Sequence, residues 1–318
     1  MQVALIAGGA GFIGSHLCQA LLLKNFRVIC VDNFLTSTKE TIASLFSNPN
    51  FSLLEHDITK LLEATTIEKV DYIFHLASPA SPNKKSPRSY LSFPIETMLV
   101  NSYGTYLLLE LARKHNASFL YASSSEIYGD PAISPQTEDY FGNVNPNGIR
   151  SVYDEGKRFG EAITFAYVRK YNLNARIIRI FNTYGPNMQK DDGRVVSNLI
   201  NQAIHNHPMT VYGDGKQTRS FCYVLDMVEG IEKAMFASAS KGEVFNLGNS
   251  DERAILEIAT IIKKLVGSSS AIHFEELPKD DPTRRKPNID KAKKILQWEP
   301  EVILEEGLKK TIEYFSLE

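Results

Sequence analysis

Short apolar runs alternate with amphipathic stretches through the first half of this chain. Five runs are almost continuously apolar, as expected of parallel strands buried on both faces: residues 3–7, 28–31, 72–76, 119–122 and 177–181. Three longer stretches repeat apolar residues at helical spacing: residues 13–24, 94–115 and 152–171. Strands that alternate with helices through short loops predict an α/β fold, with a doubly wound parallel sheet of the Rossmann type.

The pattern changes after Phe181, where proline, glycine and polar residues become frequent and two later helical patterns are separated by loops. We expect residues 182–318 to form mainly a smaller α/β lobe over the carboxyl edge of the sheet, where open α/β sheets bind ligands. Residues 1–181 would form the sheet domain. The two parts are expected to be interleaved, because residues 244–247 look like a further strand and about 219–249 would rejoin the sheet domain.

Composition narrows the class of protein. The chain has 318 residues, a net charge of −2 and no long run of one sign, so we expect neither a nucleic-acid partner nor a membrane partner. Its three cysteines are far apart in the sequence, which predicts no disulfide framework, no metal site and a cytoplasmic protein. No apolar run reaches the roughly 20 residues of a membrane helix, and no signal peptide is expected before the first strand.

A glycine-rich turn follows the first strand directly and opens the first helix. It contains Gly8, Gly11 and Gly14, with Phe12 and Ile13 between the last two. Glycines at such a turn let backbone amides approach a pyrophosphate that rests on the helix N-terminus. The turn therefore predicts a dinucleotide site, and the alternative is a purely structural glycine turn.

Asp32 ends the second strand, where a carboxylate can accept hydrogen bonds from a ribose diol and would repel a 2′-phosphate. We therefore expect NAD in preference to NADP, and residues 1–181 become an NAD-binding domain. Further strand ends are expected to line the same site: Asp57 and Ile58 near the adenine, and Leu76, Ala77 and Ser78 beside the nicotinamide ribose.

Tyr153 and Lys157 lie four residues apart in a predicted helix, which places both side chains on one face. A phenol has a pKa of about 10 and is a poor base at neutral pH, but a nearby ammonium favours the phenolate. Tyr153 could then remove a proton from a sugar hydroxyl while a nicotinamide held alongside takes a hydride. The pair therefore predicts redox chemistry on an alcohol carbon.

Six segments together resemble the extended short-chain dehydrogenase/reductases, and specifically the NAD-dependent epimerase/dehydratase family: residues 8–14, 32–33, 75–77, 101–105, 123–129 and 153–157. Four segments look most like the UDP-glucuronate decarboxylases (UDP-xylose synthases) of that family: residues 75–82, 153–158, 192–198 and 285–287. The resemblance implies decarboxylation of UDP-glucuronate to UDP-xylose through a 4-keto intermediate, with NAD regenerated within the cycle.

The same resemblance implies roles for individual residues. The catalytic set is Tyr153 as base, Lys157 as its partner, Ser124 as hydroxyl donor, Glu126 as the active-site carboxylate and Arg285 beside the sugar carboxylate. Cofactor contacts fall on Tyr153, Lys157, Asn33 and Asn101 in addition to those above. Contacts with the UDP-sugar fall on Ser125, Asn182, Arg194, Tyr212, Arg219 and Arg285, where the arginines suit a diphosphate or a carboxylate.

Three other functions stay open at this point. A 4,6-dehydratase is disfavoured, because Ser125 replaces the aspartate of the aspartate–glutamate pair in that group and a serine is a poor acid for expelling hydroxide. A UDP-sugar 4-epimerase, acting on UDP-glucuronate, is not excluded by any residue pattern. A non-catalytic NAD-binding protein is the third alternative, although it would have no use for an activated phenol.

The resemblance also implies a homodimer. The amphipathic stretches at 94–115 and 152–171 would pair with their copies in a second subunit as a four-helix bundle. The alternative is that both helices simply pack on the sheet.

Overall fold

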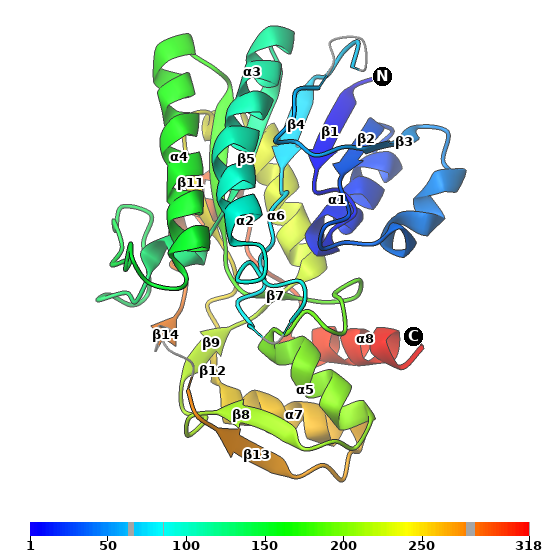
Figure 1. The fold of residues 1–318 in the computed structure, drawn as a ribbon, viewed down its shortest axis with the longest axis vertical. Coiled ribbons are helices and arrows are strands. Elements are labelled where there is room, and N and C mark those ends of the chain that lie inside the picture. Colours follow the sequence, from blue (N-terminus) through cyan, green and yellow to red (C-terminus); the bar gives the residue numbers. More distant parts are fainter. Residues whose placement is uncertain (63–66, 85, 278–283, 318) are drawn as a thin grey trace.

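A seven-stranded sheet forms the centre of the molecule (Figure 1). The computed structural model describes residues 1–62, 67–84, 86–277 and 284–317. The strands lie in the order β11-β6-β5-β4-β1-β2-β3. Their bounds are Val3–Ala7 (β1), Arg27–Asp32 (β2), Phe51–Glu55 (β3), Tyr72–His75 (β4), Ser118–Ser124 (β5), Ala175–Ile180 (β6) and Val244–Leu247 (β11). All neighbouring strands are parallel, which confirms the predicted doubly wound fold.

Helices cover both faces of this sheet. They are α1 (Phe12–Leu23), the 3₁₀ helix η1 (Lys39–Ser47), α2 (Pro94–Leu99), the π-helical turn η2 (Val100–Gly104), α3 (Thr105–His115), α4 (Ser151–Tyr171) and α6 (Val224–Phe236). On one face, α1 and α6 bury Leu17 and Ile231 in the same apolar core. On the other face, α3 and α4 bury Leu109 and Tyr167. Because every strand runs in the same direction, the loops after the strands all meet at one edge.

The smaller lobe lies beyond this edge, below the sheet in Figure 1. Its strands are β7 (Thr183–Tyr184), β8 (Met209–Tyr212), β9 (Thr218–Ser220), β10 (Cys222–Tyr223), β12 (Glu252–Ala254), β13 (Ile272–Glu275) and β14 (Arg284–Arg285). Its helices are α5 (Val195–Ile204), α7 (Ile255–Val266) and α8 (Leu304–Leu317). Leu199, Ile258 and Leu308, one from each helix, are fully buried in a core of the lobe's own.

The chain passes back and forth between the two parts. After the lobe strands β8 to β10, helix α6 returns to the sheet, and β11 pairs with β6, which confirms the strand predicted at residues 244–247. Further along the chain, the buried indole of Trp298 donates a hydrogen bond of 2.9 Å to the carbonyl of Asp226 in α6. Among the described helices, none has the length and hydrophobicity to span a membrane.

Candidate active site

Three adjoining cavities lie where the sheet meets the lobe. The first, of about 250 Å³, is lined by Asp32 and is called the Asp32 cavity. The second, of about 230 Å³, is lined by Tyr153 and is called the Tyr153 cavity; it shares Thr36 and Ser78 with the first. The third, of about 820 Å³, is bounded by the lobe and is called the lobe cavity. Glu126 is among the residues that line both the Tyr153 cavity and the lobe cavity, so these two cavities share part of one wall.

The glycine turn has a shape that only glycine allows. Gly8 has a φ of +80°, and a Cβ there would lie 2.7 Å from the backbone of Ala77. A Cβ at Gly14 would lie 2.1 Å from the carbonyl oxygen of Gly8. Gly11 and Gly14, with Phe12 and Ile13 between them, line the Tyr153 cavity at the start of α1. These features fit a turn that receives a dinucleotide pyrophosphate on backbone amides.

Asp32 connects this turn to the adjoining cavity. Its Oδ2 accepts a hydrogen bond from the amide of Ala10 at 3.0 Å, and its Oδ1 accepts one from Ser37 at 2.7 Å. The carboxylate therefore holds the turn in place and borders the Asp32 cavity. Asp57 and Ile58, expected near the adenine, line the same cavity, and so do three other residues expected to contact the cofactor: Asn33, Ala77 and Ser78. The residues present fit an NAD-type dinucleotide.

Asn101 has a different place from the other expected cofactor residues. It is fully buried in the π-helical turn, and its amide donates to Ser78 Oγ at 2.8 Å and to the carbonyl of Thr97 at 2.9 Å. Ser78 lines both the Asp32 cavity and the Tyr153 cavity, and Leu76 lines the latter. The structure thus places Asn101 behind Ser78, where it fixes the orientation of that hydroxyl.

Tyr153, Lys157 and Ser124 all line the Tyr153 cavity. Tyr153 and Lys157 project from α4, and Ser124 ends β5. The Lys157 ammonium donates to the carbonyl of Ala122 at 2.9 Å and lies 5.5 Å from the centre of the Tyr153 ring. The ring of Tyr90 stacks on that of Tyr153, with centres 4.9 Å apart and an interplanar angle of 12°. The structure therefore brings Tyr153 and Lys157 together, as predicted. The stacked ring of Tyr90 holds the Tyr153 ring in place.

Burial dominates the electrostatics of this pair. It raises the pKa of Tyr153 to about 12, although the hydrogen bond with Ser124 acts in the opposite direction. Burial also lowers the pKa of Lys157 to about 7. Desolvation penalises both charged forms, so in the protein by itself burial outweighs the effect by which the nearby ammonium was expected to favour the phenolate. A positive charge held in this cavity, such as that of an oxidised nicotinamide, would favour the phenolate.

Glu126 forms the centre of a buried ion cluster. Arg285, of which only 1% is exposed, donates to Glu126 Oε2 at 3.1 Å and to the carbonyl of Ser125 at 2.6 Å. Arg150 forms a second ion pair with the same carboxylate oxygen. Burial alone would raise the pKa of Glu126, but Arg150 and Arg285 hold it at about 2. Glu126 is thus a fixed anion on the wall shared by the Tyr153 and lobe cavities.

The lobe cavity gathers the residues expected to contact a nucleotide sugar. Asn182, Arg194, Tyr212, Arg219 and Arg285 line it, and Ser125 lines the neighbouring Tyr153 cavity. Arg194 is held by Asp192, with Nε 2.5 Å from Oδ1, and lies 5.9 Å from the ring centre of Phe12. Guanidinium groups and aromatic rings in one cavity suit a nucleoside diphosphate.

Arg150 and Tyr90 are two of the residues that line the site without having been expected from the sequence. Arg150 stands three positions before Tyr153, at a spacing that faces the same side of a helix, so its position could have been noticed. Tyr90 lies in a loop after β4, where the sequence has no helix or strand periodicity that would indicate its position. Only its stacking on Tyr153 reveals its place.

Comparison with known proteins identifies the family. Residues 4–248 match the model of the NAD dependent epimerase/dehydratase family. The chain belongs to this family. UDP-glucuronic acid decarboxylase 1 of Danio rerio is 50% identical over 99% of this chain and 72% of that protein. UDP-glucuronic acid decarboxylase 1 of Arabidopsis thaliana is 49% identical over 98% of this chain and 69% of that protein.

Solved structures of other epimerase/dehydratase proteins have the same fold. The UDP-glucuronic acid 4-epimerase of Bacillus cereus, in complex with UDP-glucuronic acid and NAD, superposes with a TM-score of 0.89. It is 30% identical, and the match covers 99% of this chain and 99% of that one. The family and this relative agree on NAD as the cofactor, as expected from Asp32 and the glycine turn.

Proposed function

We propose that this protein decarboxylates UDP-glucuronate to UDP-xylose through a 4-keto sugar. The observation that carries the proposal is the position of the Glu126–Arg285 pair. The pair lies on the wall that the Tyr153 cavity shares with the lobe cavity. The Tyr153 cavity contains the glycine turn and the Tyr153–Lys157 pair, and the lobe cavity contains the arginines. The decarboxylase relatives, at about half identity over nearly the whole chain, support this reaction in preference to other reactions of the family.

NAD, held by the glycine turn and Asp32, would supply hydride transfer: it would take a hydride from C4 of the sugar and return it within the same cycle. Tyr153 removes the proton of the C4 hydroxyl and afterwards gives it back. Ser124, beside Tyr153 in the same cavity, donates a hydrogen bond to the C4 oxygen. Lys157 lies against the Tyr153 ring and its ammonium, when protonated, favours the phenolate.

The keto sugar makes decarboxylation possible. A C4 ketone places the C6 carboxylate β to a carbonyl, so carbon dioxide can leave while the electron pair delocalises from C5 onto the C4 oxygen as an enolate. C5 then takes up a proton in place of the lost carboxylate, before the hydride returns to C4. Ser124 and the protonated Tyr153 stabilise that oxygen where its charge develops. The buried guanidinium of Arg285 supplies the positive charge near the sugar carboxylate, and Ser125 offers no acid group for dehydration.

Product analysis tests this function. Incubation with UDP-glucuronate should give carbon dioxide and a UDP-pentose, measured by mass spectrometry. Tyr153→Phe should lower turnover by about 10²- to 10⁴-fold, because it removes general acid–base catalysis, and should still bind NAD. Tyr171→Phe, at the exposed end of the same helix, is the matched control and should turn over normally.

Other products point to other functions. The Bacillus cereus relative, solved with UDP-glucuronic acid, makes a 4-epimerase the second candidate. A UDP-hexuronate epimer as the sole product would support that candidate. Binding of NAD without turnover of any nucleotide sugar would support the non-catalytic alternative.

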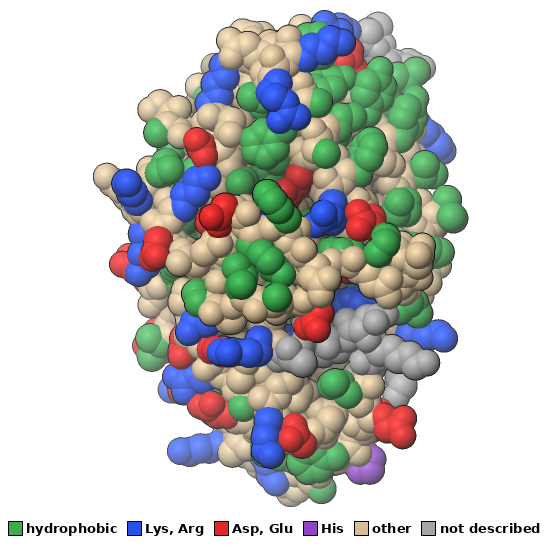
Figure 2. Space-filling view, turned by 90° about the vertical axis from the view of Figure 1, so that its left-hand side faces the viewer, with side chains coloured by type: hydrophobic (Ala, Val, Ile, Leu, Met, Phe, Trp, Pro, Cys, Tyr) green, Lys and Arg blue, Asp and Glu red, His purple; other side chains and the backbone are tan. Residues whose placement is uncertain are grey.

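We also propose that the protein is a cytoplasmic homodimer. Helices α2 and α4 pack side by side, and their outer side chains are exposed and apolar: Ile95 (66%), Met98 (36%), Leu99 (44%) and Phe159 (47%). Figure 2, a view onto the side where α4 lies in Figure 1, shows hydrophobic side chains at several places over the sheet-bearing half. Such a face supports a four-helix bundle formed with a second copy.

A further inference from the structure

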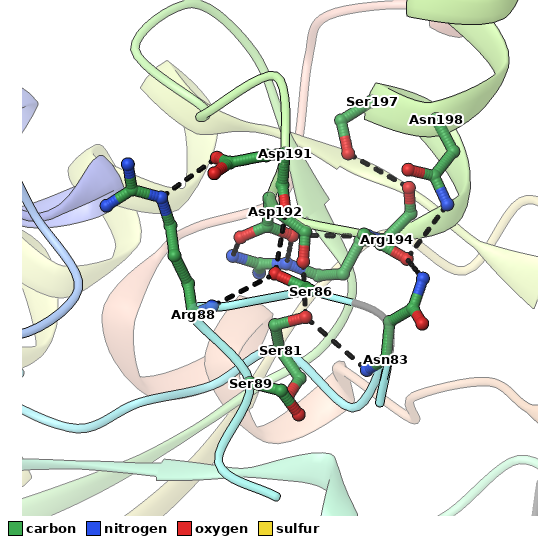
Figure 3. A network of polar contacts seen from close by, with 11 residues as sticks. Ser81, Asn83, Ser86, Arg88, Ser89, Asp191, Asp192, Arg194, Ser197 and Asn198 are labelled. Atoms are coloured by element: carbon green, nitrogen blue, oxygen red, sulfur yellow. Dashed lines mark hydrogen bonds and ion pairs between the residues drawn. The ribbon is translucent and has the colours of Figure 1, made fainter. Parts of the chain in front are cut away.

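Residues 86–92, called the strap, connect the sheet domain to the lobe. The strap lies in the connection between β4 and α2, and its side chains bind the loop at residues 189–194, called the lobe loop (Figure 3). Ser86 Oγ donates to the carbonyl of Asp191 at 2.6 Å. Arg88 Nε donates to the carboxylate of the same residue at 2.8 Å. Both the backbone and the side chain of Asp191 are therefore held by the strap.

Arg88 also reaches a third segment. Its Nη1 donates to the carbonyl of Thr36 at 2.8 Å. Thr36 is adjacent to Ser37, whose hydroxyl binds Asp32 at 2.7 Å. One guanidinium therefore connects the segment after β2, the strap and the lobe loop. The fork of an arginine can donate in several directions at once, which a lysine cannot do in the same geometry.

These contacts lie around the Tyr153 cavity. Thr36, Arg88 and Asp192 line this cavity together with the glycine turn, and Tyr90 of the strap stacks on Tyr153 within it. Two residues before the strap bind the same lobe loop: Ser81 Oγ donates to the carbonyl of Asp192, and Asn83 Nδ2 donates to that of Gly193 at 3.2 Å. The strap and the lobe loop thus form one connected wall.

We infer that the Arg88–Asp191 cross-link keeps this wall closed and retains the nicotinamide cofactor. Arg88 is a positioning residue, because it acts through the strap. The chemistry gives retention a purpose: the reduced cofactor has to stay until it returns its hydride, since its loss would leave a keto sugar unreduced. That purpose rests on the proposed function, whereas retention itself requires only that NAD bind.

The release rate of NADH tests the inference without any sugar. Protein loaded with NADH is mixed rapidly with excess NAD, and the loss of bound-NADH fluorescence is followed. Arg88→Ala should release NADH about tenfold faster than the wild type, the effect of losing charge-assisted hydrogen bonds worth about 1.4 kcal/mol. Arg253→Ala, which breaks an ion pair of similar exposure between β12 and Glu257 of α7, is the matched control and should release at the wild-type rate.

Two further measurements separate retention from a general loss of structure. Salt screens an ion pair, so added sodium chloride should accelerate release from the wild type more than from Arg88→Ala. Arg88→Lys should release NADH at an intermediate rate, because it keeps the charge but loses the fork. UDP affinity, which depends on the lobe cavity, should be the same in all variants, and this measurement also shows whether Arg88→Ala is folded.

The outcomes are decisive either way. Equal release rates for Arg88→Ala, Arg253→Ala and the wild type would overturn the inference. Should Arg88→Ala fail to fold, Arg88→Lys and Asp191→Asn carry the same test, and wild-type rates in both would overturn it. With UDP-glucuronate, faster release should also yield a UDP-4-keto-pentose. If no sugar reacts, the proposed function fails, and the release rates still decide the question of retention.

Discussion

At the level of single residues, burial in the Tyr153 cavity sets the charge states of Tyr153 and Lys157. The spacing of Tyr153 and Lys157 fixed their common helix face, and the structure brings both to one cavity. Their pKa values depend on burial, which lowers that of Lys157 to about 7 and raises that of Tyr153 to about 12. Burial is a property of the packed molecule and has no local signature in the chain.

The pKa of Lys157 predicts a pH-dependent stability. Its folded-state pKa, about 7, is below the ordinary value of 10.5, so between these pH values the unfolded chain binds one more proton than the folded one. The free energy of unfolding should therefore rise with pH across this window, by up to about 1.4 kcal/mol per unit, and fall as the pH drops towards 7. Lys157→Met should remove this contribution.

Urea unfolding of the cofactor-free proteins at pH 7, 8 and 9 measures the effect. The wild type should gain stability relative to Lys157→Met as the pH rises. Lys264→Met, at an exposed position on α7, is the matched control and should leave the pH dependence of the wild type unchanged. A wild-type minus Lys157→Met difference that is constant with pH would show that the ammonium is not desolvated.

At the level of elements, apolar periodicity predicted most strands of the sheet and the helices that pack on it, but it gave no prediction for α5, α6 or the short strands of the lobe. Residues 94–115 are helical as expected, but Val100–Gly104 form a π-helical turn between α2 and α3. Thr105 Oγ donates to the carbonyl of Asn101 at 2.8 Å beside this turn. The spacing of apolar residues indicates which face is buried, and it is too coarse to distinguish one π turn from an α-helix.

The turn between β1 and α1 gives a prediction at this scale. A Cβ on residue 14 would lie 2.1 Å from the carbonyl oxygen of Gly8, so Gly14→Ala must move the turn. We expect NAD affinity, measured by calorimetry, to fall by about 100-fold, the effect of an overpacking strain near 2.7 kcal/mol.

Gly267→Ala is the control for this experiment. Residue 267 has a φ of +70° and nothing within 4 Å of a built Cβ, so this change strains the backbone without a collision. It should cost about 1 kcal/mol of stability and leave NAD affinity unchanged. Wild-type affinity in Gly14→Ala would show that the turn does not form the pyrophosphate site.

At the scale of the whole molecule, the exposed face of α2 and α4 predicts self-association. Sedimentation at micromolar concentration should give about twice the chain mass of 35.7 kDa. Ile95→Glu should shift the protein to a monomer, because a desolvated carboxylate in an apolar interface is costly. Leu225→Glu, at a position 51% exposed on α6, is the matched control and should stay dimeric. A monomeric wild type would contradict the proposed dimer.

Local patterns in the chain were enough to predict the α/β class, the glycine turn and the helix face that Tyr153 and Lys157 share. These depend on local rules: apolar periodicity, the absence of a Cβ and the rise of a helix. Other predictions came from the family resemblance, and the roles of Arg219 and Arg285 stay predictions that the cavities support.

The pairs of distant residues that share a cavity wall are recognised only in the folded molecule. Glu126 and Arg285 are separated by 159 positions, and Arg88 and Asp191 by 103, yet each pair lies within hydrogen-bonding distance. Packing of the lobe on the sheet creates these contacts, and the same packing excludes the water that would otherwise set the pKa values. Long-range contact and desolvation both arise from the folded chain as a whole, which is why no local pattern revealed them.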